Sequence, residues 1–279
     1  MGTPAGIYAF LREDINKCLR DMLIEYGAYL LSPESTEYLN SQPDGWFNET
    51  ALLTMSEVAS PPPSTKPFSE IYVCNPSLPS YGFTSWDDFF IRKFKPGIRP
   101  VYQPDNNGVI TNCCESGPYN LQPDVKARDE FWIKGQPYSL ADMFGSATLS
   151  SPYVGGTVYQ AFLSALSYHC WHAPVSGIVK DIINIPGSYY AENYWEGFAN
   201  IGTDGKPNPD PAAPNNSQAY ICQVATRSVL ILEADDQRIG EMTIVQVGMA
   251  EVSTCEWYIQ KGQHIRKGDL IGTVSALFY

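Results

Sequence analysis

The chain has 279 residues, of which 44% are hydrophobic and 13% aromatic. This length and composition are typical of a globular protein with one large domain or two modest ones, and they exclude a disordered chain. The formal net charge of −12 argues against binding to nucleic acid or to anionic membranes, because like charges repel. No run of about 18 apolar residues occurs, so we expect no membrane insertion.

Seven cysteines are spread along the chain, and no two of them have the CxxC spacing. An odd number without paired spacing indicates reduced thiols in a cytoplasmic protein, and it argues against a disulfide framework or a zinc ribbon. The adjacent pair Cys113 and Cys114 is interpreted as two small buried residues.

The first third of the sequence has helical periodicity. Apolar residues recur every three or four positions over residues 4–31, which predicts a helix that ends before Ser32 and Pro33. A second helix is predicted to begin at Asn48, a favourable N-cap residue. A third is predicted in SWDDFFIRKF, with Ser85 as its cap.

From about residue 101 the pattern changes to short runs of valine and isoleucine between turn residues, which indicates β-strands. The predicted strands include GVIT, GIVKDIINI, SVLILEA and MTIVQVGMAEV. KGQHIRKGDLIG, residues 261–272, resembles the hairpins of barrel-sandwich hybrid domains. No exposed Met-Lys-Met tip is present, so a lipoyl or biotin carrier is not expected.

The segment YHCWHAP, residues 168–174, contains two of the three histidines of the chain. His169 and His172 are either placed for chemistry or are polar residues at the edge of a strand. Two histidines and one nearby glutamate are a weak metal constellation, so no metal site is expected.

Four motifs in the same order resemble the phosphatidylserine decarboxylase family. They are FTSWDDFFIRKFKPGIRPV, YHCWHAPVSGIV, VGMAEVSTC and KGQHIRKGDLIG. The likeness covers residues 80–272 and is strongest to the soluble fungal branch that includes tryptophan decarboxylases. It implies an α+β fold, with a β-rich core of antiparallel sheets around a barrel-sandwich-hybrid-like unit. It also implies a helical N-terminal cap over residues 1–66 and a catalytic domain over residues 67–279.

The resemblance implies a self-cleaving proenzyme whose pyruvoyl group acts as an electron sink for decarboxylation. Residue by residue, His172 matches the histidine of the cleavage triad and His169 matches the histidine of the decarboxylation step. Glu115 stands where the family has an aspartate. Trp171, Met249 and Tyr168 are predicted to bind the substrate.

The family continues after its GD-x-LG motif to a Gly-Ser cleavage site, whereas this sequence continues as TVSALFY. We therefore expect no pyruvoyl group from this chain, unless a separate α chain supplies one. The first hypothesis is a pyruvoyl-independent cyclase, isomerase or lyase of secondary metabolism, acting on a small amino-acid-derived, aromatic or polyketide intermediate.

Two alternatives remain. One is the β portion of a pyruvoyl-dependent decarboxylase of aromatic L-amino acids such as tryptophan. The other is a non-catalytic partner of an active paralogue. The expected partners are a small-molecule substrate and, because family members are commonly dimers, a second copy of the chain.

Overall fold

The computed structural model describes residues 4–128, 138–193, 200–206, 208, 210 and 216–275. The α-helices are α1 (Pro4–Phe10), α2 (Glu13–Leu31), α3 (Glu49–Ala59), α4 (Phe68–Ile71), α5 (Trp86–Phe90), α6 (Leu140–Met143), α7 (Ala147–Ser150) and α9 (Gln218–Val224). Three 3₁₀ turns are η1 (Pro33–Tyr38), η2 (Pro79–Gly82) and η3 (Ser151–Tyr153). The strands are β1 (Gly117–Pro123), β2 (Thr157–Phe162), β3 (Cys170–His172), β4 (Gly177–Ile185), β5 (Arg227–Ala234), β6 (Glu241–Val247), β7 (Thr254–Trp257), β8 (His264–Ile265) and β9 (Leu270–Ser275).

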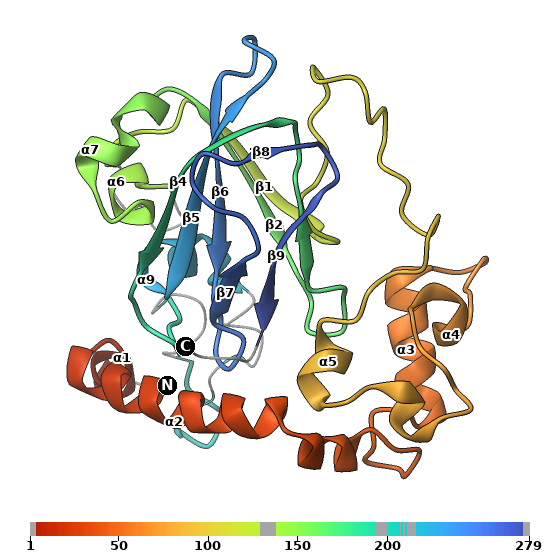
Figure 1. Cartoon of the computed structure of the whole chain (residues 1–279). Coiled ribbons are helices and arrows are strands. Elements are labelled where there is room, and N and C mark those ends of the chain that lie inside the picture. The colour runs from red at the N-terminus through yellow and green to blue at the C-terminus, as the bar shows by residue number, and fades with distance from the viewer. Residues whose placement is uncertain are drawn as a thin grey trace.

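The helix predicted over residues 4–31 is two helices, because the backbone of Arg12 is extended. Asn16 stabilises this break by donating its side-chain amide to the carbonyls of Phe10 and Arg12 at 2.7 and 2.8 Å. Its amide oxygen accepts the backbone N–H of Tyr189 at 3.0 Å. The side chain of Asn16 at this break therefore links α2 to the β-rich part of the chain. Helix α2 lies beneath that part in Figure 1.

The two predicted N-caps are confirmed. The side chain of Asn48 accepts the N–H of Ala51 at the start of α3, and Ser85 accepts the N–H of Asp88 at the start of α5. Each cap satisfies a helix N–H that has no carbonyl partner within its own helix. Helix α5 is shorter than predicted and ends at Phe90, so Arg92 and Lys93 lie on the segment that follows it.

The strands form antiparallel sheets with the orders β6-β5-β4-β8, β3-β9-β7 and β1-β2. Their order along the chain is shown in Figure 1. Three of the four predicted strand runs are confirmed as β4, β5 and β6. The prediction that GVIT forms a strand was wrong, because this segment does not form a ladder of hydrogen bonds with a neighbouring strand. The backbone N–H of Thr111 donates to the carbonyl of Pro174, and the ammonium of Lys267 donates to the carbonyl of Val109.

The main hydrophobic core lies between the four-stranded and the three-stranded sheets. Its buried members come from both sheets: Trp171, Val179, Leu230, Leu232, Ile244, Ile271 and Val274. Burial of side chains of this size stabilises the fold by about 2 kcal/mol each before the entropic cost of ordering them. The predicted α+β class with antiparallel sheets is confirmed.

A second apolar cluster joins the helices to the histidine segment. It contains Leu39, Phe47 and Met55 from the first 66 residues, together with Phe68, Tyr72, Phe89, Tyr168 and Cys170. This cluster spans the predicted boundary between residues 66 and 67, which stays a prediction. Its consequence is that the N-terminal helices help to position Tyr168 and Cys170.

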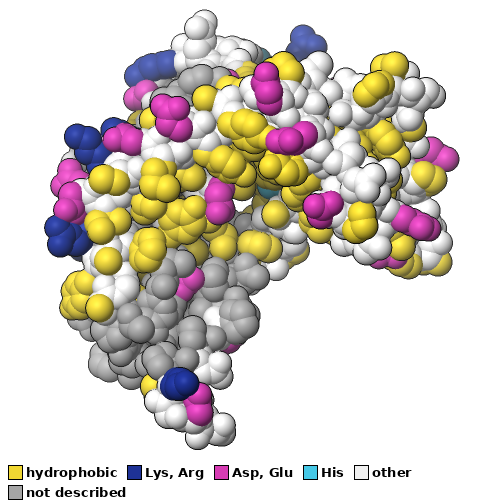
Figure 2. All heavy atoms as spheres, turned by 90° about the horizontal axis from the view of Figure 1, so that it is seen from below, with side chains coloured by type: hydrophobic (Ala, Val, Ile, Leu, Met, Phe, Trp, Pro, Cys, Tyr) yellow, Lys and Arg dark blue, Asp and Glu magenta, His cyan; other side chains and the backbone are white. Residues whose placement is uncertain are grey.

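The face seen from below carries apolar side chains, many of them over the helical layer (Figure 2). On α1 and α2 the most exposed are Tyr8 at 77% and Met22 at 67%. None of the described helices is both long enough and apolar enough to span a membrane. All seven cysteines are free, as predicted.

Candidate active site

Tyr168 and His172 form a fixed pair at the start of the three-stranded sheet. The Nδ1–H of His172 donates to the carbonyl of Gly268 at 2.8 Å, because a carbonyl can only accept. The Nε2 atom therefore accepts the hydroxyl of Tyr168 at 2.9 Å. Burial raises the pKa of the Tyr168 phenol, so this hydroxyl keeps its proton. Both ring nitrogens of His172 are thus engaged.

His169 is buried, with only 2% of its surface exposed, and its ring stacks on Phe90 with 4.0 Å between the centroids. Its Nε2–H donates to the carbonyl of Ala165 at 3.1 Å, which leaves Nδ1 with a lone pair. This Nδ1 has no hydrogen-bond partner among the described residues. Burial lowers the pKa of His169 to about 4, so the imidazole is neutral at pH 7 and can accept a proton at Nδ1.

Glu115 does not form the pair with His172 that the triad would require. Its Oε1 accepts from the guanidinium of Arg99, with Nε at 2.8 Å, while the nitrogens of His172 bond to Tyr168 and Gly268. Its other oxygen is buried and has no hydrogen-bond partner in the described part of the chain. Burial raises the pKa of Glu115, and its charge acts on the nearby phenol of Tyr168. The carboxylate is therefore close to the histidine segment, although it is held by an arginine.

Arg92 is a buried residue that our sequence interpretation did not single out. Its guanidinium donates to the carbonyls of Leu166 and Ser167 at 2.6 and 3.1 Å, directly before Tyr168. It also lies over the rings of Tyr72 and Phe89, 4.5 and 5.1 Å from their centroids. The motif FFIRKF could have indicated this residue, because its arginine follows aromatic residues that face the core.

The other predicted binding residues lie apart. Trp171 is buried in the core between the sheets and packs there rather than facing solvent. The sulfur of Met249 accepts a hydrogen bond from Gln218 at 3.6 Å, in a turn after β6 where its backbone pairs with Val252. The structure therefore brings together Tyr168, His169 and His172, and the contacts of Met249 point elsewhere.

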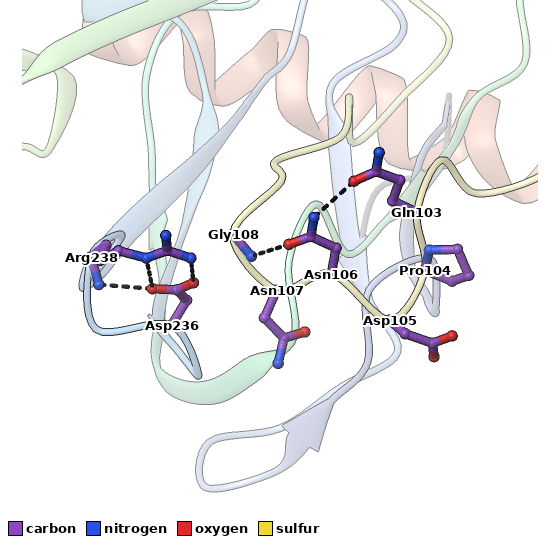
Figure 3. A pocket seen from close by; sticks show the side chains of 8 residues that line it. All are labelled: Gln103, Pro104, Asp105, Asn106, Asn107, Gly108, Asp236 and Arg238. Atoms are coloured by element: carbon purple, nitrogen blue, oxygen red, sulfur yellow. Dashed lines mark hydrogen bonds and ion pairs between the residues drawn. The ribbon is translucent and has the colours of Figure 1, made fainter.

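A hollow of about 550 Å³ lies between the loop of residues 103–108 and the β5–β6 turn (Figure 3). Its polar groups bond to one another: Arg238 pairs with Asp236, and Asn106 bonds to Gln103 and Gly108. In Figure 1 this turn is at the end of the sheet away from α5. The hollow is thus separate from His169, which stacks against α5.

In the part of the chain that the structure describes, no three His, Cys, Asp or Glu side chains converge as a metal site. The chemistry available at the histidine segment is therefore that of a neutral imidazole, a phenol and a carboxylate. These groups hold and transfer protons.

Sequence models of phosphatidylserine decarboxylase match residues 86–276 and residues 1–55. The chain belongs to the phosphatidylserine decarboxylase family. Its histidine segment, Arg92 and strands β1 to β9 all lie within the longer match. The helices α1 and α2 lie within the shorter one.

Two of the fungal relatives are similar to nearly the whole chain. Decarboxylase iboD of Amanita muscaria is 39% identical over 272 residues, which is 97% of this chain and 76% of that protein. The L-tryptophan decarboxylase of Psilocybe cubensis is 36% identical over 98% of this chain and 62% of its own length. Phosphatidylserine decarboxylase proenzyme 3 of Schizosaccharomyces pombe is 26% identical over 74% of this chain. The chain thus spans about three quarters of iboD and about three fifths of the tryptophan decarboxylase.

Proposed function

We propose that this chain takes part in the decarboxylation of a small amino acid in a biosynthetic pathway, with His169 as the principal proton-transferring group. The observation that carries the proposal is the buried neutral imidazole of His169 with its unpartnered Nδ1. Two relatives that are similar to nearly the whole chain support this proposal: Decarboxylase iboD supports decarboxylation, and an L-tryptophan decarboxylase supports an aromatic amino acid as the substrate.

His169 is placed beside the end of β9. Its backbone carbonyl accepts the N–H of Val274 at 3.2 Å, so its backbone lies next to β9 of the three-stranded sheet. The bond from Nε2–H to Ala165 fixes both the tautomer and the direction of Nδ1. A proton is therefore accepted at one defined atom, in surroundings that exclude water.

His172 and Tyr168 act beside it as a positioned pair. The carbonyl of Gly268 fixes the ring of His172, and the hydroxyl of Tyr168 is the hydrogen-bond donor to its other nitrogen. The ring of His172 thereby fixes the direction of the Tyr168 hydroxyl, which keeps its proton because burial raises the pKa of the phenol. Arg92 orients this segment through the two carbonyls before Tyr168.

The residues present fit the pyruvoyl group that the family implies. That group supplies the electron sink for loss of carbon dioxide. The groups of this chain that could border it are the Nδ1 of His169 and the hydroxyl of Thr254, neither of which has a hydrogen-bond partner among the described residues. The backbone of Thr254 pairs in register with Ser275, and the backbone of His169 bonds to Val274, so both residues lie at the end of β9.

A pyruvoyl-independent cyclase or isomerase uses the same acid–base groups and is the main rival proposal. A non-catalytic partner of an active paralogue is the third. Decarboxylation is preferred because the relatives named above are decarboxylases, and the retained His169 geometry favours catalysis over binding alone. A homodimer in the cytoplasm is proposed with it.

The test is release of labelled carbon dioxide from carboxyl-labelled tryptophan and other amino acids by the purified protein. Intact mass spectrometry after reduction with borohydride in the presence of tryptophan is run in parallel. His169→Gln keeps a donor for Ala165 and removes the Nδ1 base. His264→Gln, at the exposed position of β8, is the matched control.

Release by the wild type and His264→Gln, but not by His169→Gln, supports the proposal. A reduced tryptophan adduct on a polypeptide would support a pyruvoyl group. No carbon dioxide and no adduct would contradict decarboxylation and favour the cyclase or isomerase.

A further inference from the structure

Asp87 is a buried carboxylate that the proposed mechanism does not use. It lies in the first turn of α5 with 2% of its surface exposed. Its Oδ1 atom has no hydrogen-bond partner among the described residues. An ionised carboxylate buried without a partner is costly, so a position of this kind calls for an explanation.

Asp87 is on the face of α5 that looks toward the three-stranded sheet. Phe90, three residues later, is on the same face of the helix, and its ring stacks on His169. The charged groups that act on Asp87 are Glu256 on β7, Asp88 on its own helix, and Lys93. Asp87 is therefore placed near Glu256 of β7, about one helical turn from Phe90, whose ring stacks on His169.

The sheet presents a polar row to α5. Cys170 on β3, Thr273 on β9 and Glu256 on β7 are partners in register, so their side chains are on one face. The ammonium of Lys93 donates to the sulfur of Cys170 at 3.0 Å, and the hydroxyls of Tyr258 and Thr273 are 3.1 Å apart. The site thus contains a carboxylate on each side, Asp87 and Glu256, and one ammonium that is bonded to sulfur.

This balance of charges favours a cationic ligand. Two carboxylates face one ammonium, and burial together with Glu256 and Asp88 raises the pKa of Asp87 to about 7. A second positive charge in the site would pair with Asp87 and offset its desolvation. Among the described charged groups that act on Asp87, Lys93 alone is positive, so an anionic ligand would meet more negative than positive charge there.

We propose that Asp87 and Glu256 form a subsite that binds the protonated amino group of a small amine or amino acid, beside the imidazole of His169. This inference rests on the proposed function for the class of ligand, since a decarboxylase of amino acids binds an amine at both ends of its reaction. Asp87 is then a substrate-binding residue, and the bond it forms is from the ligand N–H to Oδ1.

The test is calorimetric titration of the chain with tryptamine, for the wild type, Asp87→Asn and Asp88→Asn. Asp88 is adjacent but exposed, and its carboxylate accepts from Thr84, so it is the matched control. Asp87→Asn removes the buried charge and keeps the shape, so it is expected to fold, which thermal melting verifies. We expect a loss of affinity of about tenfold or more in Asp87→Asn, as for a lost charge-assisted hydrogen bond, and little change in Asp88→Asn.

The pH dependence is a second readout. The ionised form of Asp87 binds the amine, so wild-type affinity should rise about tenfold between pH values one unit below and one unit above its pKa. Asp87→Asn should lose this dependence, and Asp88→Asn should keep it. Equal binding by all three proteins, no binding of tryptamine to the wild type, or tighter binding of indole-3-propionate would each overturn the subsite.

The proposed decarboxylase function and the proposed amine subsite can be disproved independently. If tryptamine binds through Asp87 but no labelled carbon dioxide is released, the subsite stands and the decarboxylase does not. If carbon dioxide is released equally by the wild type and Asp87→Asn, the decarboxylase stands and the subsite does not.

Discussion

The phenol oxygen of Tyr168 and the Nε2 of His172 are joined by a hydrogen bond of 2.9 Å, and Gly268 holds the other ring nitrogen. This arrangement occupies the positions that a carboxylate and a serine would take in a hydrolase-like triad. His172 is thus fixed in one tautomer by a backbone carbonyl and a phenol. The carboxylate of Glu115 is committed to Arg99.

Tyr168→Phe should remove this bond while keeping the aromatic packing on Phe94. We expect a loss of about 1 kcal/mol in the free energy of unfolding, measured by urea denaturation. The nitrogen spectrum of His172 should show Nδ1 still protonated, because Gly268 still accepts from it. Tyr159→Phe, exposed on β2, is the control and should change neither quantity. Equal stability of the two variants would contradict the assignment.

The buried imidazole of His169 should make stability depend on pH. Its pKa is lowered to about 4 in the folded chain and is near 6.5 in the unfolded one, so only the unfolded state binds a proton between these values. Stability is therefore fully present above the unfolded pKa and falls as the pH drops toward 4. The contribution reaches roughly 3 kcal/mol.

Denaturation curves of His169→Gln and wild type between these pH values would measure this contribution as a difference. The free energy of unfolding of the wild type minus that of His169→Gln should decrease as the pH falls, because only the wild type contains the imidazole that must stay neutral in the folded state. A difference that does not change with pH would exclude a buried neutral His169.

Arg92→Met should detach the segment before Tyr168, since the guanidinium holds the carbonyls of Leu166 and Ser167. Loss of a buried cation with several bonds predicts a destabilisation of about 3 kcal/mol. Amide hydrogen exchange of residues 165–169 should quicken more than that of β5. Arg238→Met is the control, because this side chain is 81% exposed, and it should change stability by less than about 0.5 kcal/mol.

Much of the fold could be predicted because it follows local rules. Valine and isoleucine runs became β4, β5 and β6, and the two capping residues begin α3 and α5 as expected. The break in the first helix could not be predicted, because it depends on Asn16 reaching Tyr189, 173 residues away. Periodicity describes one helix face and says nothing of a partner that distant.

In the candidate site, too, the local features could be predicted from the sequence and the long-range contacts could not. The motif predicted that His169 and His172 belong together, and the structure places them on one segment. It could not predict that Glu115 would pair with Arg99, since both residues were known only as charges in separate turns. Asp87 was not singled out in the sequence, because its burial depends on the sheet that packs beside α5.

Gly272→Ala should disrupt the three-stranded sheet. Gly272 lies between Trp171 and Trp257 in register, and a Cβ there would collide with the backbone carbonyl of Glu256. We expect a destabilisation of about 2 kcal/mol or more by urea denaturation, with altered fluorescence of the flanking tryptophans. Gly117→Ala on exposed β1 is the control, because a Cβ there meets nothing within 4 Å. Equal stability of the two variants would mean that β7 and β9 are not paired in this register.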